Sequence, residues 1–136
     1  MGMQETLKVC ASLEELDTVI DFVEEKLSDA DCPMKVCRQI MVSVEEIYVN
    51  VANYAYSDAE GSCEVILQTQ ENSVTIQVSD NGKPFNPLER DDPDITLSAE
   101  EREIGGLGIY MTKTIMDEVS YEYINNQNRL TMTKSW

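Results

Sequence analysis

The stretch SCEVILQTQENSVTIQVSD, residues 62–80, decides the fold. Residues 62–70 and residues 73–80 have the alternating pattern of β-strands with one buried face. Glu71 and Asn72 stand between the two segments, where a two-residue turn would join them. The stretch therefore predicts an antiparallel hairpin.

Upstream of this hairpin the sequence predicts a strand and a helix. Residues 4–10 indicate a short edge strand. Apolar side chains then recur at helical spacing, and this helix should end near Asp29. Ser12, followed by Glu15 three residues later, matches a capping box and predicts where the helix begins.

A second helix and three later elements complete the pattern. Pro33 is well placed to start a helix that runs to about Tyr54. Three prolines and a run of acidic residues predict a loop from Lys83 to about Ile104. After it we expect a helix over about 107–117, then strands near 118–124 and 129–135 with Asn125 and Asn126 in the turn between them.

The order of these elements predicts the fold class. It is β-α-α-β-β-loop-α-β-β, which indicates an α+β two-layer sandwich with a mixed, mostly antiparallel sheet and helices on one face. The length of 136 residues suits one domain with one core, so we expect residues 1–136 to form a single domain. The loop is longer than a compact domain needs, and such loops are usually either functional lids or disordered.

Composition excludes several classes of function. The net charge of −16 argues against nucleic acid and against an anionic membrane surface as partners, because both need basic footprints. The chain has no apolar run near the length of a membrane span and no secretory segment. Its four cysteines form no C-x-x-C pair, and no histidine could complete a zinc site. We expect reduced thiols, a cytoplasmic location, and acid–base chemistry that does not use histidine.

The second predicted helix carries two stripes. Its segment VSVEEIYVNVANYAY covers residues 42–56. Glu46, Asn50 and Asn53 share one face, about 130° from the apolar stripe at 100° per residue. This face is either solvated or a polar wall in which Asn50 offers an amide oxygen to Mg²⁺ and Glu46 acts as a general base. The apolar stripe, which we assign to the core, consists of Ile40, Val44, Ile47, Val51 and Ala55.

The segment VSDNGKPFNP, residues 78–87, places a carboxylate at the end of a predicted strand. Asp80 and Gly82 could belong to a hairpin turn. Pro84 and Pro87 weaken that interpretation, because the following segment cannot continue as a paired central strand. Alternatively, Asp80 accepts a hydrogen bond from an exocyclic amine while the backbone at Gly82 lies close to a flat ring such as adenine.

The segment EREIGGLGIYMTK, residues 101–113, is a glycine-rich turn before a helix. It matches neither a Walker A loop nor a dinucleotide-binding loop, so by itself it could be a simple turn. Free N–H groups around Gly106 and Gly108 could nevertheless bind phosphates. A nucleotide would use all of these features: Asn50 for metal and phosphates, Asp80 for adenine, residues 84–104 as a lid, and the glycines for phosphates.

These three segments, in this order, resemble the GHKL (Bergerat-fold) ATPases, which include histidine-kinase catalytic domains, DNA gyrase and Hsp90. Within that superfamily the chain resembles the anti-sigma-factor serine/threonine kinases of the RsbW and SpoIIAB type. The similarity rests on EEIYVNVANYAY (45–56), DNGKPFNP (80–87) and GGLGIYMTKTIMDEV (105–119). Tyr54 departs from the pattern, since many members have histidine there.

The resemblance implies a histidine-kinase-like ATPase fold that uses ATP and Mg²⁺. It implies that Glu46 is the catalytic base, that Asn50 ligates Mg²⁺ and that Asp80 binds the adenine amine. The further residues implied to bind the nucleotide are Asn53, Gly82, Pro84, Arg102, Gly105, Gly106, Leu107 and Gly108.

The implied reaction is phosphoryl transfer from ATP to a serine or threonine of an anti-anti-sigma (STAS) protein, which would regulate a sigma factor by partner switching. Two alternatives stay open. One is a nucleotide-gated protein-binding module without significant kinase activity, and the other is a scaffold with a vestigial pocket. Dimers are common in the family, so the resemblance also raises the question of a homodimer.

Overall fold

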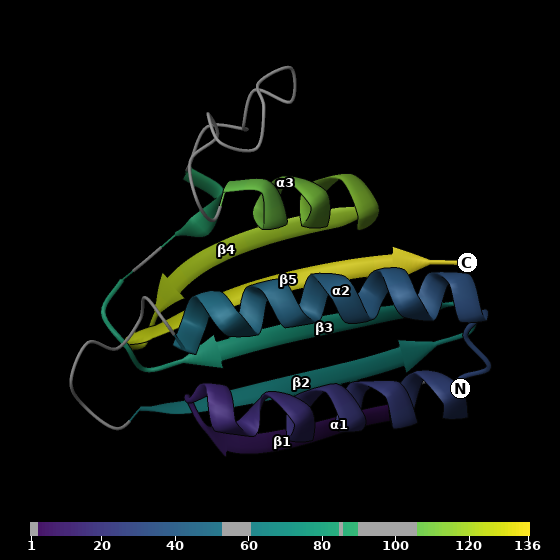
Figure 1. The fold of residues 1–136 in the computed structure, drawn as a ribbon, viewed down its shortest axis with the longest axis horizontal. Helices are drawn as coiled ribbons and strands as arrows, with labels where there is room; N and C mark the ends of the chain where they lie inside the picture. The colour runs from purple at the N-terminus through teal and green to yellow at the C-terminus, as the bar shows by residue number, and fades with distance from the viewer. Residues whose placement is uncertain (1–2, 53–60, 85, 90–105) are drawn as a thin grey trace.

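The computed structural model describes residues 3–52, 61–84, 86–89 and 106–136. The described residues form five strands and three α-helices in the expected order (Figure 1). The elements are β1 (Met3–Cys10), α1 (Leu16–Asp29), α2 (Met34–Asn50), β2 (Ser62–Gln70), β3 (Ser73–Asp80), α3 (Gly106–Ile115), β4 (Glu118–Ile124) and β5 (Gln127–Ser135), with 3₁₀ turns η1 (Leu13–Glu15) and η3 (Pro87–Glu89).

The predicted hairpin is confirmed as β2 and β3, and it lies inside one sheet of order β1-β2-β3-β5-β4. All four pairings of described strands are antiparallel, so the sheet is fully antiparallel rather than mixed. Asn72 turns the hairpin with a φ of 61°. Asn125 and Asn126, with φ of 54° and 61°, turn β4 into β5 as expected, because asparagine tolerates this left-handed backbone.

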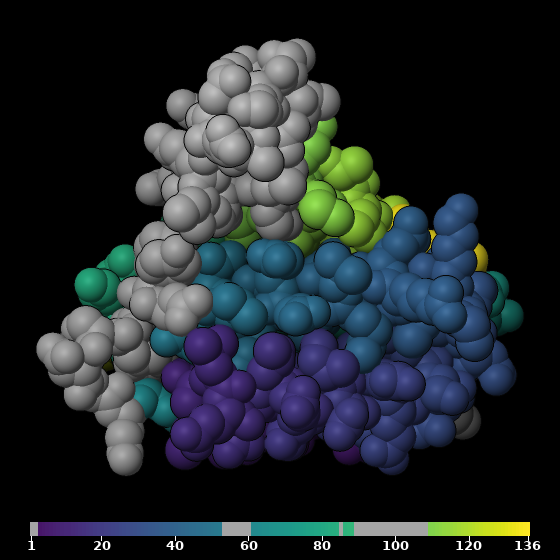
Figure 2. All heavy atoms as spheres, viewed as in Figure 1, coloured from purple at the N-terminus to yellow at the C-terminus, as the bar shows by residue number. Residues whose placement is uncertain are grey.

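The helices cover one face of the sheet, which confirms the two-layer arrangement (Figure 1). In the space-filling view α1 and α2 lie side by side over the strands, with α3 beyond α2 (Figure 2). Alternate strand residues bury their side chains under these helices, while the opposite face carries mainly polar side chains. The core includes Val19, Val23 and Leu27 of α1, Ile40, Val44 and Ile47 of α2, and Val65, Leu67, Val74, Ile76, Val78, Leu130 and Met132 of the sheet.

Helix α2 differs from its prediction in two respects. The α-helix ends at Asn50 and a π-helical turn follows at residues 51–52, a distortion that is often found at functional sites. The expected continuation to Tyr54, with Ala55 in the core stripe, falls outside the described residues. Ser43 and Tyr48 are fully buried on α2 although neither belonged to the predicted stripe.

The predicted capping box at Ser12 is wrong. The Ser12 side chain makes no cap hydrogen bond, and Glu15 belongs to η1, so that α1 begins at Leu16. The buried Tyr48 hydroxyl binds the Ser12 backbone instead: it accepts from the Ser12 N–H at 3.2 Å and donates toward the carbonyls of Ser12 at 2.7 Å and Cys10 at 2.9 Å. The Ser12 N–H, which a capping box would pair with the Glu15 side chain, is thus bound by the distant Tyr48 hydroxyl.

Tyr48 is expected to stabilise the fold through this hydroxyl. Burial raises its pKa to about 12, so the hydroxyl keeps the proton that it donates. The Tyr48→Phe variant should lose about 1–3 kcal/mol of unfolding free energy in urea, because the Ser12 N–H loses a partner at a part-buried site. The control is Tyr123→Phe at a residue that is 42% exposed on β4. Equal stability losses in the two variants would contradict this role.

None of the described helices is long and apolar enough to cross a membrane.

Candidate functional site

Asp80 is a buried carboxylate at the end of a central strand. It is the last residue of β3, lies opposite Asn128 of β5, and is 4% exposed. Its Oδ1 accepts hydrogen bonds from the backbone N–H of Gly82 at 2.9 Å and from Asn128 Nδ2 at 3.0 Å. The Asp-x-Gly pattern therefore forms a compact turn in which the glycine N–H folds back onto the carboxylate.

The Asn128 amide is held on both of its sides. Its Nδ2 also donates to the carbonyl of Lys83 at 2.9 Å, and the Tyr121 hydroxyl of β4 donates to its Oδ1. The amide thereby joins β4, β5 and the turn that follows β3. Within the described residues, Oδ1 of Asp80 has two donors and no hydrogen bond reaches Oδ2. One carboxylate oxygen is fixed in place and the other can accept a hydrogen bond from a ligand.

The pKa of Asp80 is raised from its ordinary value. Burial is the main cause, and the hydrogen bonds from Asn128 and Gly82 partly oppose it by favouring the ionised form. Because the folded state holds this proton more tightly than the unfolded chain, ionisation of Asp80 reduces stability as the pH rises from the ordinary value through the raised one. A carboxylate that lowers stability when ionised is typical of a functional site.

Asp80 borders a small pocket between α2 and the sheet. Its volume is about 20 Å³, which is room for about one water molecule. The walls are mostly apolar and carry a few polar groups, which is the usual make-up of a small-molecule site. The lining residues are Ile47, Asn50, Val51, Val78, Asp80, Pro87, Tyr121, Asn128 and Leu130.

Of the predicted polar face of α2, Asn50 is the described residue that lines this pocket. It is 8% exposed, and its side-chain amide makes no hydrogen bond within the described part of the chain. A nearly buried amide without a protein partner, placed beside a carboxylate, has an oxygen available for a hard cation or a polar ligand. Glu46 lies one turn earlier on α2, is half-buried, and does not line the pocket.

The structure locates only some of the other predicted residues. Gly82 is buried in the turn after Asp80, whereas Pro84 is exposed. Gly106, Leu107 and Gly108 form the first turn of α3, so the glycine segment does open a helix as expected. Asn53, Arg102 and Gly105 lie outside the described residues.

Asn128 and Tyr121 are site residues that the sequence reasoning missed. Asn128 follows a turn, where asparagine is common, and Tyr121 has the alternation of an edge strand. The only signal was register: once β3 pairs with β5, Asn128 stands opposite Asp80. Short-range patterns carry no information about which distant strands pair.

The family of this chain follows from a match over nearly its whole length. The family model described as "Histidine kinase-like ATPase domain" matches residues 9–134. The chain belongs to this family. The match spans α2, the Asp80 turn and α3, so the three segments compared in the sequence lie within one family domain.

Individual relatives agree with this assignment. The chain is 32% identical over 82 residues to the serine-protein kinase RsbW of Bacillus thuringiensis (strain Al Hakam). The aligned residues make up 57% of this chain and 51% of that protein. It is also 32% identical over 89 residues to the serine-protein kinase RsbW of Listeria monocytogenes serovar 1/2a. That alignment covers 62% of this chain and 57% of that protein. The matches thus span only about half the length of these relatives.

A solved structure shares the fold. The crystal structure of the RsbU and RsbW domains of Rv1364c from Mycobacterium tuberculosis superposes with a TM-score of 0.67 at 15% identity. The superposition covers 96% of this chain and 32% of that one. At this identity the likeness supports the α+β fold and no statement about activity.

The role of Asn128 can be measured through the titration of Asp80. In Asn128→Ala the pKa of Asp80 should rise further, because the variant loses a hydrogen bond that favours the ionised carboxylate. Carbon-13 NMR of the Asp80 carboxyl group would report the shift. Thr131→Ala, on the opposite face of β5, is the matched control and should leave that pKa where it is in the wild type. An unchanged titration in Asn128→Ala would show that the amide does not act on the carboxylate.

Proposed function

We propose that the pocket beside Asp80 binds the adenine of ATP. The observation that carries this proposal is the arrangement of the buried carboxylate: Oδ1 is fixed by Gly82 and Asn128, while Oδ2 accepts no hydrogen bond within the described residues. A carboxylate oxygen that only accepts hydrogen bonds selects a base with an exocyclic amine and disfavours one with a carbonyl at the same position. The membership in an ATPase domain family supports this choice of ligand.

Nucleotide binding must widen the pocket. Its volume of about 20 Å³ suits one water molecule and is far too small for a purine ring. Pro87 of η3 and Tyr121 of β4 line the pocket together with residues of α2, so a shift of η3 is one way to admit the ring. Asp80 and Asn128, held by strand pairing, would stay in place.

The proposed phosphate end combines three groups. Asn50 fits a Mg²⁺ ligand, because its nearly buried amide has no protein hydrogen bond within the described residues. When bound, Mg²⁺ would supply positive charge to the phosphate oxygens. Backbone N–H groups in the first turn of α3, at Gly106 and Gly108, would donate to phosphates, and Arg102 is a further proposed contact.

The proposed reaction is protein phosphorylation. Glu46 would accept the proton of a serine or threonine hydroxyl while the γ-phosphoryl group passes from ATP to that oxygen, leaving ADP. The names of the RsbW relatives, serine-protein kinases, support this activity. We further propose that the phosphorylated protein is an anti-anti-sigma (STAS) partner, that a sigma factor is the regulated protein, and that residues 1–136 act as one cytoplasmic domain.

Binding of ATP should depend on the Asp80 carboxylate. Calorimetry with ATP and ADP, with and without Mg²⁺, should show Mg²⁺-dependent binding of ATP to the wild type. In Asp80→Asn, affinity should fall by roughly 10- to 150-fold, since hydrogen bonds to charged groups contribute about 1.5–3 kcal/mol. Asp21→Asn, an exposed carboxylate on α1, should bind like the wild type. Failure of the wild type to bind any adenine nucleotide would reject the proposed function.

Catalysis should depend on Glu46 without affecting ATP affinity. In Glu46→Gln, transfer of phosphate from ATP to a STAS protein should fall by roughly 10²- to 10⁴-fold, the usual contribution of a general base. Glu45→Gln removes the neighbouring, exposed carboxylate of α2 and is the control.

The same assay separates the two leading functions. If the wild type transfers no phosphate but binds its partner more tightly with ATP, and Glu46→Gln does so equally, the chain is a nucleotide-gated binding module rather than a kinase.

A further inference from the structure

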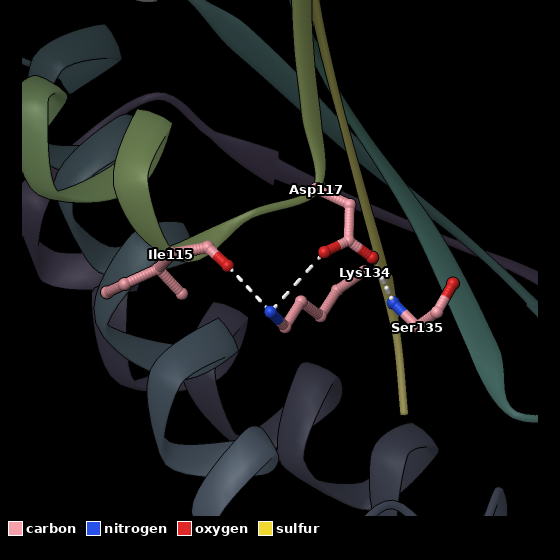
Figure 3. Close-up of polar contacts among 4 residues, drawn as sticks. All are labelled: Ile115, Asp117, Lys134 and Ser135. Carbon is pink, nitrogen blue, oxygen red and sulfur yellow. Dashed lines mark hydrogen bonds and ion pairs between the residues drawn. The ribbon is translucent and has the colours of Figure 1, made fainter.

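The C-terminal end of α3 is fixed to β5 by a compact group of polar contacts (Figure 3). Lys134 Nζ donates to the carbonyl of Ile115, the last residue of α3, at 2.8 Å. It also lies 3.5 Å from Asp117 Oδ1, and the Lys134 side chain is only 19% exposed. A cation on the last carbonyl of a helix satisfies an orphan acceptor and complements the helix dipole.

Asp117 completes the attachment through its backbone and its second oxygen. Its N–H donates to the Thr133 carbonyl at 2.9 Å, and its Oδ2 accepts from the Ser135 N–H at 2.7 Å. Only Met116 and Asp117 separate α3 from β4. The end of the helix is therefore joined to two neighbouring strands, β4 through the chain and β5 through hydrogen bonds.

Among the described residues, no polar side-chain contact joins the opposite end of α3 to the sheet. α3 packs against α2, and Ile109 next to its first turn is buried in the hydrophobic core. Its first turn, at Gly106 to Gly108, contains the backbone N–H groups that the proposed function assigns to phosphate. A helix of 10 residues is about 15 Å long, so the contacts that hold its C-terminal end act together with its packing on α2 to set where its first turn lies.

We propose that Lys134 is a positioning residue for the phosphate end of the nucleotide site. It touches no substrate; it fixes the carbonyl of Ile115 and orients Asp117, and the rigid helix carries this orientation to the N–H groups near Gly106. This inference rests on the proposed function. It assigns a role to Lys134 and Asp117 that is separate from adenine recognition, because the adenine end is built by Asp80 and Asn128 on the strands.

The test compares a ligand with phosphates and one without. In Lys134→Met, affinity for Mg²⁺-ATP should fall by about fivefold or more, comparable to one misplaced hydrogen bond, while affinity for adenosine stays at the wild-type value. NMR titration measures both affinities. Lys134→Arg keeps a cationic donor of similar length and should recover part of the ATP affinity. Lys8→Met removes a lysine that is 76% exposed on β1 and is the matched control.

The outcomes separate positioning from general stability. A parallel loss of ATP and adenosine affinity, or no loss of either, would overturn the inference. If the wild type binds neither ligand, the proposed function fails. Amide hydrogen exchange across α3 then tests separately whether Lys134 holds this helix in place. Faster exchange through the first turns of α3 in Lys134→Met than in Lys8→Met would support it, and equal exchange would overturn it.

Discussion

A carboxylate buried at the end of a central strand constrains much of this structure. Removing the charged Asp80 from water is unfavourable, and two N–H donors offset part of that cost. One donor requires the backbone to turn tightly at Gly82, and the other requires β5 to lie beside β3 in a single register. Tyr121 of the edge strand then fixes the Asn128 amide. The turn at Gly82, the β3–β5 register and the position of Asn128 together place two donors on one carboxylate oxygen.

The proposed nucleotide site divides into two ends with different mechanical properties. The adenine end belongs to the sheet, where strand pairing on both sides of β3 limits movement. The phosphate end belongs to α3, a short helix that rests mainly on α2 and is fastened at its C-terminal end. Such a division separates the carboxylate proposed to recognise the base from the N–H groups proposed to bind the phosphates. Affinity for the base and response to the phosphates can then change independently.

The sequence predicted the local elements well because they depend on local patterns. The alternation in residues 62–80 and the asparagine turn before β5 gave the hairpins, and helical spacing gave the ends of α1 within a turn. It failed where a distant residue replaced a local interaction: Tyr48 binds the backbone at Ser12, so the capping box does not form. Asn128 was missed for a related reason, since its function depends on strand register, which no local pattern specifies.

The most direct test of the account concerns the hydrogen bond from a base amine to Asp80. Calorimetry should compare ATP with purine riboside triphosphate, which has the same sugar and phosphates but lacks the exocyclic amine. The account predicts roughly 10- to 150-fold weaker binding of the analogue, the usual contribution of a hydrogen bond to a charged group. Equal affinities would contradict the account, because Asp80 would then accept no hydrogen bond from the exocyclic amine.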